Sequence, residues 1–314
     1  MATNATRTYE PYRKHPALFA GDFKEEWLHR DFAQILQAFR EKAKGSSLVD
    51  DVDAVIPTLL RKEMEGVYSF NAFSDDFVRI FNEEINNFYD VSERESIPVR
   101  RPNSMNNYGV IVNEMGMRPL ISSLQHEYLW PLSRHLFPVE ASQFDSHHSF
   151  IVRYRAEEDL GLDMHTDDSD VTFNVCLGEN FTGATLSFCG MFGASNHRQH
   201  THTYHHQVGR AILHLGNRRH GADDIESGRR SNLIVWNHNH KYRASGVKAW
   251  NRSEGYEKEE LPPSAICLSY THDRDYETFK EPSSTQKQQA RRSRPWCPPP
   301  GKEYDSFKWP KNEL

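Results

Sequence analysis

Residues 165–188 read HTDDSDVTFNVCLGENFTGATLSF, and this stretch decides how the rest of the chain is interpreted. It begins with His165 and Asp167, which are separated by one residue. On a β-strand, side chains alternate between the two faces, so an imidazole and a carboxylate at this spacing point the same way. On a helix the same two side chains would diverge by roughly 200°. The pair is therefore a candidate for two ligands of one metal ion.

The sequence on either side of this pair is typical of β-strands. Residues 147–155 (HHSFIVRYR) and 171–177 (VTFNVCL) are rich in β-branched and aromatic residues. A second His-x-Asp pair, His29 and Asp31, lies in residues 22–44, where apolar side chains recur at helical spacing. The metal hypothesis therefore applies to the first pair.

Two residues further along the chain would complete such a site. His220 is the candidate third ligand. Two histidines and one carboxylate would then lie on one side of the ion and leave the opposite positions open. Arg230 follows ten residues later, and its permanent charge and planar fork suit a carboxylate of a dicarboxylic co-substrate. His214 competes with His220 for the third position, and Arg229 competes with Arg230. The ten-residue interval favours His220, since it lets the chain turn after one strand and return along the next.

These segments resemble the Fe(II)- and 2-oxoglutarate-dependent dioxygenases of the prolyl 4-hydroxylase-like type. The matching segments are Tyr154, His165 to Asp167, 181–188 (FTGATLSF), 208–216 (VGRAILHLG), 220–221 (His-Gly) and 227–236 (SGRRSNLIVW). The amino-acid sequence of 165–184 most resembles that of the eukaryotic 2-oxoglutarate- and iron-dependent oxygenase domain-containing proteins. The resemblance is strong over 145–240 and weak over 65–145. One departure, Gly183-Ala184 where the family turn usually has Gly-Gly, changes a turn and not the chemistry.

The resemblance implies a fold, a ligand set and a reaction. The fold would be α+β, a double-stranded β-helix (jelly roll, cupin-like) core with N-terminal supporting helices. His165, Asp167 and His220 would bind Fe(II), while Arg230 and Tyr154 would bind 2-oxoglutarate. With O₂ as co-substrate and ascorbate as reductant, the enzyme would hydroxylate a protein side chain, prolyl or lysyl, and release succinate and CO₂. No catalytic residue beyond the metal centre is expected.

The spacing of the strand-like segments independently favours a sandwich or jelly roll, because no helices lie between them. The predicted strands of this core are 147–155, 171–177, 184–190, 208–214, 231–237 and 264–270. The predicted elements before it are helices at 22–44 and 50–64, a strand at 65–72, a helix capped within Ser74 to Asp76, a loop at 91–109, a strand at 108–112 and a helix at 117–137. We expect an N-terminal polar and helical extension (1–64), a dioxygenase domain (65–272, core 145–240) and a Pro-rich, basic C-terminal tail (273–314).

Length and composition limit the classes of protein to which this chain could belong. The chain has 314 residues, of which 37% are hydrophobic, enough for a substantial core. A formal net charge of −6 argues weakly against non-specific nucleic-acid binding. No apolar stretch approaches the ~20 residues that span a membrane. The first 15 residues contain no hydrophobic signal region. The expected location is intracellular, cytoplasmic or nuclear.

Three features allow more than one interpretation. The four cysteines show no Cys-x-x-Cys pairing, so we expect free thiols in a reducing compartment. The histidine-rich loop 193–207 could hold a second metal, but its loose spacing and lack of cysteine favour no site. The tail could be a docking segment, although a solvated tail is the simpler expectation.

Two alternatives to the dioxygenase stay open. A catalytically inactive jelly-roll binding module would keep the fold without needing the three ligands and Arg230. A cupin-like metal enzyme that does not use 2-oxoglutarate would need no arginine after the distal histidine. The sequence does not identify the substrate or the oligomeric state.

Overall fold

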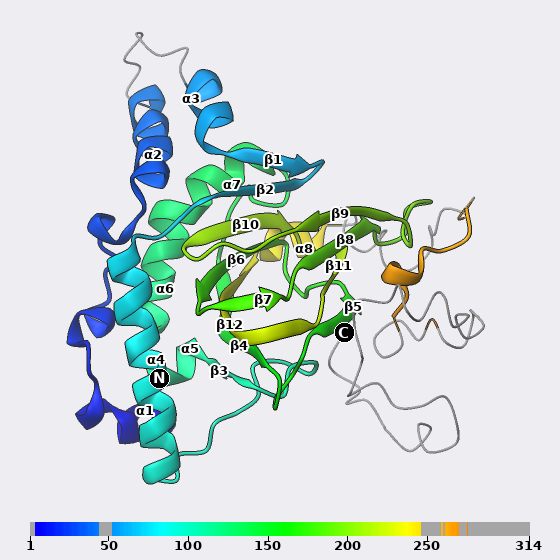
Figure 1. Ribbon diagram of the computed structural model, residues 1–314. Helices are drawn as coiled ribbons and strands as arrows, with labels where there is room; N and C mark the ends of the chain where they lie inside the picture. The colour runs from blue at the N-terminus through cyan, green and yellow to red at the C-terminus, as the bar shows by residue number, and fades with distance from the viewer. Residues whose placement is uncertain (1–3, 44–51, 246–258, 260, 270–274, 276–314) are drawn as a thin grey trace.

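The computed structural model describes residues 4–43, 52–245, 259, 261–269 and 275 (Figure 1). The helices are α1 (Asn4–Tyr9), η1 (Glu10–Tyr12), η2 (Pro16–Phe19), η3 (Glu25–Trp27), α2 (Arg30–Ala43), α3 (Val52–Leu59), α4 (Asp75–Arg94), α5 (Val112–Met115), α6 (Arg118–Ser123), η4 (Leu124–Leu129), α7 (Trp130–Leu136), α8 (His240–Ala244) and η5 (Ala265–Cys267). The strands are β1 (Arg61–Met64), β2 (Val67–Asn71), β3 (Gly109–Ile111), β4 (Ser146–Arg155), β5 (Leu162–His165), β6 (Val171–Gly178), β7 (Phe181–Gly183), β8 (Leu186–Met191), β9 (His200–Tyr204), β10 (Arg210–Leu215), β11 (Arg218–Ala222) and β12 (Ile225–His238). Apart from Asp275, the predicted tail lies outside the described residues.

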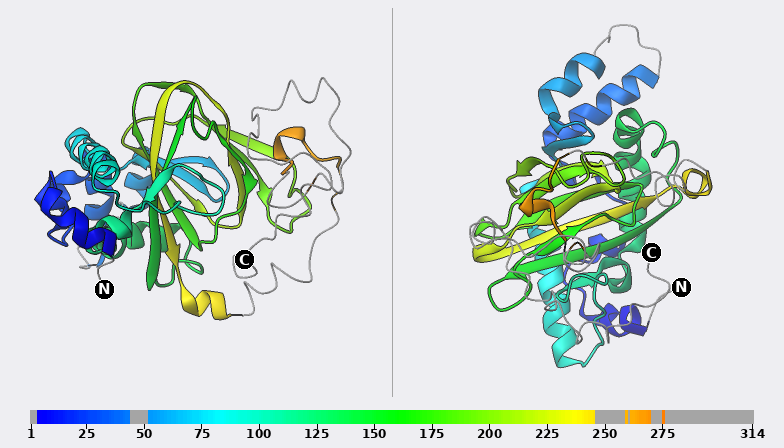
Figure 2. Two further views of the ribbon diagram at one scale, coloured as in Figure 1. Left: turned by 90° about the horizontal axis from the view of Figure 1, so that it is seen from below. Right: turned by 90° about the vertical axis from the view of Figure 1, so that its right-hand side faces the viewer.

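Two antiparallel sheets form the centre of the molecule (Figure 2). The larger sheet has the order β1-β2-β10-β6-β12-β4-β3, and the smaller has the order β5-β11-β8-β9. The pairing is nested along the chain: β4 pairs with β12, β5 with β11, β6 with β10, and β8 with β9. This nesting is the jelly-roll topology. The predicted α+β fold with a jelly-roll core is therefore confirmed.

The larger sheet is buried on both faces. β6 is buried at every position because side chains of alternate residues enter two different layers. Val171, Phe173 and Val175 belong to the core between sheet and helices, whereas Thr172 and Asn174 line the space between the two sheets. In the space between the two sheets, polar side chains of the larger sheet therefore face those of the smaller sheet.

Helices cover the outer face of the larger sheet, as Figure 1 shows for α2, α4 and α6. α4 begins after Ser74, whose hydroxyl accepts the backbone N–H of Phe77 at 3.3 Å, an N-cap in the predicted region. Its side chains at helical spacing, including Phe77 and Phe81, pack into the same core as Phe173. No helix in the described ranges is long and apolar enough to cross a membrane.

Several predicted elements need correction. The range 264–270 is not a strand: it contains the 3₁₀ turn η5. The predicted helix at 50–64 ends at Leu59, and β1 follows it. The loop 193–207 contains the strand β9. β5 and β11 were not predicted, because they are short and β11 reads Arg-Arg-His-Gly-Ala, a composition unlike that of a typical strand.

The prediction of four free thiols is wrong for two of them. Cys189 of β8 and Cys267 of η5 form a disulfide, with their Cα atoms 6.1 Å apart. They are separated by 78 residues in sequence, so local spacing could not reveal the pair. Cys176 is a buried free cysteine, as predicted, and Cys297 lies outside the described residues.

Candidate metal centre

The two predicted histidine ligands face each other across neighbouring strands. His165 is the last residue of β5 and is the antiparallel partner of His220 on β11. Directly opposed residues on antiparallel strands bring their Cβ atoms to about 4.5–5.5 Å. The two ring centroids lie 4.4 Å apart. The register of the smaller sheet therefore places both imidazoles at one point.

Asp167 reaches the same point from a loop and not from a strand face. β5 ends at His165, so the alternation of strand faces does not explain the direction of Asp167. Its backbone N–H donates to the carbonyl of Gly216, at the end of β10, over 2.9 Å. This turn places Asp167 Oδ1 3.3 Å from His165 Nε2 and 3.7 Å from His220 Nε2.

Backbone carbonyls orient both imidazole rings. His165 Nδ1 donates to the carbonyl of Asp163 over 2.8 Å, and His220 Nδ1 donates to the carbonyl of Arg218 over 2.9 Å. A neutral ring whose Nδ1 carries the hydrogen presents a lone pair at Nε2. Both rings thus turn their Nε2 atoms towards Asp167, in the arrangement that outer hydrogen bonds give to metal-binding histidines.

The carboxylate of Asp167 is also held from one side. Thr172 Oγ1 donates to Oδ2 over 2.6 Å, and the Ser169 hydroxyl lies 2.6 Å from the same Thr172 oxygen. Oδ1, the oxygen nearer the two histidines, is left for another partner. Potential ligand atoms of His165, Asp167 and His220 all lie within 4.8 Å of one another.

The protonation states of His220 and Asp167 favour the binding of a cation. Burial lowers the pKa of His220 to about 3, so its ring is neutral near pH 7. Burial alone would raise the pKa of Asp167, but the adjoining His220 and His165 rings hold it well below its usual range. Lone pairs and an anionic oxygen then converge in a buried place, where they repel one another without a cation. The donor set fits a divalent metal such as Fe(II), with the opposite side open.

His214 lies next to this group but is arranged differently. Its Nε2 is 3.9 Å from Asp167 Oδ2, the oxygen that Thr172 already occupies, and not from Oδ1. Its ring packs edge-on against the His220 ring, with centroids 4.7 Å apart. The geometry therefore favours His220 over His214 as the distal ligand.

Replacing Thr172 with valine should weaken Fe(II) binding about 10- to 100-fold, because valine keeps the shape but removes the hydrogen bond to Asp167. Anaerobic Fe(II) titration of the purified variant measures the effect. Thr172→Ser, which keeps the hydroxyl, is the matched control and should bind nearly as the unaltered chain does. Weak binding by Thr172→Ser together with near-normal binding by Thr172→Val would mean that the methyl packing and not the hydrogen bond matters.

Arg230 and Tyr154 are paired residues on β12 and β4. Both side chains are almost fully buried, and the guanidinium lies 4.6 Å from the tyrosine ring centroid. Arg230 Nη1 donates to the carbonyl of Ala184. Burial lowers the pKa of Arg230, and no carboxylate in the described part of the chain forms an ion pair with it. A buried cation without a counterion favours an anionic ligand.

Arg229, the competing arginine, points the other way. It forms an ion pair with Glu179, and its side chain keeps 28% of its exposure. The alternation along β12 therefore presents Arg230, and not Arg229, to the interior.

One cavity of about 980 Å³ between the two sheets contains the three metal-ligand candidates and Arg230 in its lining. Its wall on the larger sheet is a ladder of facing pairs from β12 and β4. From the Arg230 end these pairs are Arg230–Tyr154, Asn232–Val152, Ile234–Phe150 and Trp236–His148. The wall thus changes from charged to apolar to aromatic along its length.

The two predicted loops differ in their relation to this cavity. From the predicted loop 91–109, whose first residues belong to α4 (Asp75–Arg94), residues 100–106 line it. The histidines of 193–207 do not line it, and within the described residues no second group of three potential ligands occurs. The second metal site is therefore not supported there.

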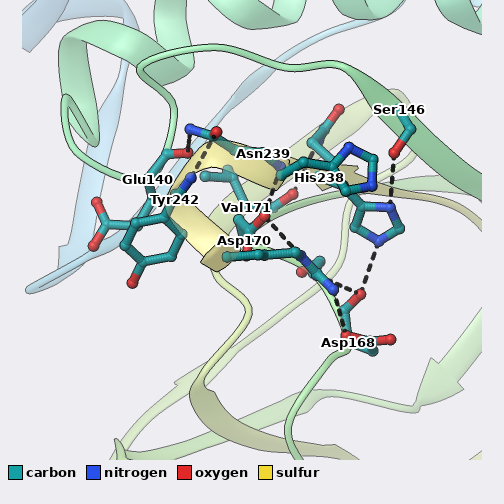
Figure 3. Close-up of polar contacts among 12 residues, drawn as sticks. Glu140, Ser146, Asp168, Asp170, Val171, His238, Asn239 and Tyr242 are labelled. Atoms are coloured by element: carbon teal, nitrogen blue, oxygen red, sulfur yellow. Dashed lines mark hydrogen bonds and ion pairs between the residues drawn. The ribbon is translucent and has the colours of Figure 1, made fainter. Parts of the chain in front are cut away.

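A polar network behind the Asp167 loop was not predicted (Figure 3). Arg243 of α8 binds Asp168 Oδ1 at 2.8 Å and Asp170 Oδ2 at 2.9 Å. The backbone N–H of Asn239 also donates to Asp170, over 2.6 Å, and His238 Nε2 donates to the carbonyl of Asp168 over 2.9 Å. These contacts attach the loop that carries Asp167 to the end of β12 and to α8. No local pattern connects Arg243 with that loop, so only the fold reveals it.

Comparisons with known proteins found several that are similar to this chain. Residues 6–141 match the OGFOD2-like domain. The 2-oxoglutarate and iron-dependent oxygenase domain-containing protein 2 of Homo sapiens is 37% identical over 203 residues, covering 62% of this chain and 55% of that protein. The ICU11 protein of Arabidopsis thaliana, also named as a 2-oxoglutarate and iron-dependent oxygenase domain-containing protein, is 36% identical over 177 residues, covering 54% and 45%.

Among solved structures, a prolyl 4-hydroxylase from Phytophthora capsici aligns with a TM-score of 0.45 at 16% identity, covering 73% of this chain and 72% of that one. The chain spans about half the length of the curated relatives it matches. Its residues 6–141 are similar to the OGFOD2-like domain, and the chain is similar to the 2-oxoglutarate and iron-dependent oxygenase domain-containing proteins.

Proposed function

We propose that this chain is an Fe(II)- and 2-oxoglutarate-dependent dioxygenase that hydroxylates a protein side chain. One observation carries the proposal: two histidines, one aspartate and a buried, unpaired arginine all line one cavity. The first three residues are the ligand set of facial-triad iron sites. The arginine supplies the charge that a dicarboxylic co-substrate needs at its far end.

Each residue then has a defined task. His165, Asp167 and His220 would hold Fe(II), and Arg230 with Tyr154 would hold the distal carboxylate of 2-oxoglutarate. Bound iron would supply the oxidising chemistry, in which 2-oxoglutarate and O₂ are consumed and succinate, CO₂ and a hydroxylated product are formed. The protein's own contribution is orientation and exclusion of water by the apolar pairs of the cavity wall. Ascorbate as the reductant is part of the same proposal.

A peptide side chain, prolyl or lysyl, is the proposed substrate. Pockets of 300–1,000 Å³ accommodate drug-sized ligands, so a cavity of about 980 Å³ has room for a small co-substrate and an entering side chain. The aromatic pair Trp236 and His148 lies at the opposite end of the wall from Arg230. An apolar, aromatic end of the cavity suits a prolyl ring or the methylene stem of a lysyl side chain.

Purified protein with Fe(II) should release succinate from 2-oxoglutarate slowly even without a peptide, because the ligand set is complete. We expect release in air and almost none in anaerobic samples, measured by chromatography. Asp167→Ala, which removes the one charged ligand, is the control for iron free in solution. Equal succinate in the two atmospheres would contradict the proposal and favour an inactive jelly-roll module.

A further inference from the structure

A carboxylate without a cationic partner lines the cavity. Glu140, Asp168 and Asp170 all belong to the cavity lining. Asp168 and Asp170 both form ion pairs with Arg243, at 2.8 and 2.9 Å. Glu140 is partly buried, and no arginine, lysine or histidine in the described ranges forms an ion pair with it. Such a carboxylate is a candidate for binding a cation from outside the chain.

One buried residue positions both Glu140 and Tyr242. Asn239 is 0% exposed, and its side-chain amide donates to the backbone carbonyl of Glu140 over 2.9 Å. Its Oδ1 accepts the backbone N–H of Tyr242 at 3.0 Å, as the N-cap of α8. Asn239 follows directly on β12. Glu140 and Tyr242 therefore lie at the Trp236 end of the cavity wall, away from Arg230.

Tyr242 supplies a second unpaired group beside Glu140. It is 9% exposed and lines the cavity, and its hydroxyl has no hydrogen-bond partner among the described residues. Burial, followed by the charges of Glu140 and Asp170, raises the pKa of Tyr242 to about 12, so the hydroxyl keeps its proton. Figure 3 shows the Glu140 carboxylate beside the Tyr242 ring. Buried tyrosine hydroxyls usually have a partner, so the pair indicates a ligand that binds both groups.

The surroundings of this pair favour a basic side chain as the ligand. A carboxylate and a phenol oxygen both accept N–H groups. The rings of Trp236 and His148 lie on the adjoining wall, with centroids 5.7 Å apart, and aromatic faces attract cations and cover methylene stems. Two arginines also line the cavity, but Arg100 pairs with Glu114 and Arg101 is exposed. The partly buried charge at this end is therefore negative.

We propose that Glu140 and Tyr242 form a subsite for the cationic group of a basic side chain in the substrate peptide. The inference rests on the proposed function and deepens it by naming the substrate class, a peptide that contains lysine or arginine. The ammonium or guanidinium group would donate to the Glu140 carboxylate and the Tyr242 oxygen. Its methylene stem would pack along Trp236.

Peptides that differ only in charge test this subsite. Each carries one proline and one variable residue, which is lysine, norleucine or glutamate and is placed in turn at every position around the proline. A second series without proline tests lysine as the hydroxylated residue. Calorimetric titration of protein loaded with 2-oxoglutarate and Mn(II), which prevents turnover, gives each affinity. Because norleucine keeps the stem of lysine and lacks its charge, we expect lysine to bind about 3- to 10-fold more tightly at one position at least.

Variants assign this preference to the two residues. Glu140→Gln keeps the shape and removes the charge, so it should abolish the difference between lysine and norleucine peptides. Glu140→Lys should favour the glutamate peptides, a gain that a misfolded protein would not show. Tyr242→Phe should remove part of the lysine preference. Glu93→Gln, at an exposed carboxylate of α4 outside the cavity lining, is the matched control for the change in net charge.

Equal binding of lysine and norleucine peptides at every position, or a lysine preference that survives in Glu140→Gln, would overturn the subsite. A preference of the unaltered protein for glutamate peptides would also overturn it and would assign the selection to Arg101. Absence of binding by every peptide would contradict both the subsite and a peptide substrate. Failure of the dioxygenase proposal is separate, because it appears as equal succinate release in air and in anaerobic samples without any peptide.

Discussion

Replacing His220 with alanine is expected to abolish Fe(II) binding and all 2-oxoglutarate turnover. His220 Nε2 is one of the two candidate ligand nitrogens that face Asp167 Oδ1, and its ring is fixed by the Arg218 carbonyl. Removing it would leave two protein ligands where a facial site needs three. Anaerobic Fe(II) titration and succinate release are the two measurements, and both should fall to the level of a sample without protein.

His214→Ala is the matched control for this prediction. His214 Nε2 faces the Asp167 oxygen that Thr172 occupies, so its removal should leave metal binding in place. The variant should lose stability, because a fully buried ring that packs against His220 and Phe188 is removed. Tight Fe(II) binding by His220→Ala with none by His214→Ala would reverse the assignment.

The sequence predicted which three side chains come together, but it did not predict how the backbone directs Asp167 towards the two histidines. The His-x-Asp spacing indicated two side chains on one strand face, whereas β5 stops at His165 and a bend delivers Asp167. The bend depends on the hydrogen bond from the Asp167 backbone N–H to the carbonyl of Gly216, which lies between β10 and β11. Spacing identifies residues that can meet, but the contact that turns the chain is long-range and has no local signal.

Hydrophobic periodicity and residue composition predicted the elements whose own residues carry a regular apolar pattern. α4 and the strands β4 and β6 have regular apolar patterns, and they form where expected. β11 carries Arg218 and Arg219 with buried side chains, so its strand character comes from the sheet and not from its own residues.

The residues around the ligands were missed for a related reason. Thr172 and Asn174 could have been found from alternation along 171–177, which places them opposite the apolar Phe173. Arg243 could not, because it approaches the Asp167 loop from α8, far along the chain. Its role depends on side-chain contacts that only the folded structure brings together.

Arg230→Ala should raise the apparent Michaelis constant for 2-oxoglutarate strongly while leaving Fe(II) binding nearly intact. Removing one partner of a buried charge pair costs about 2–5 kcal/mol, or roughly 30- to 5,000-fold in affinity. Arg230 has no carboxylate partner within the described residues and is 2% exposed, so the loss should fall on the ligand's charge and not on a protein ion pair. Initial rates of succinate release against 2-oxoglutarate concentration give the constant, and Fe(II) titration gives the metal affinity.

Arg229→Ala is the control that makes this result specific. Arg229 is the neighbouring residue of β12, and its exposed ion pair with Glu179 should be worth about 1 kcal/mol or less. We therefore expect a Michaelis constant close to that of the unaltered chain. The Arg230 contact with the Tyr154 ring and its bond to the Ala184 carbonyl also stabilise the fold, so thermal unfolding of both variants must be compared before the kinetic difference is assigned to the ligand. A strong effect of Arg229→Ala together with a weak effect of Arg230→Ala would mean that β12 presents the opposite face to the co-substrate.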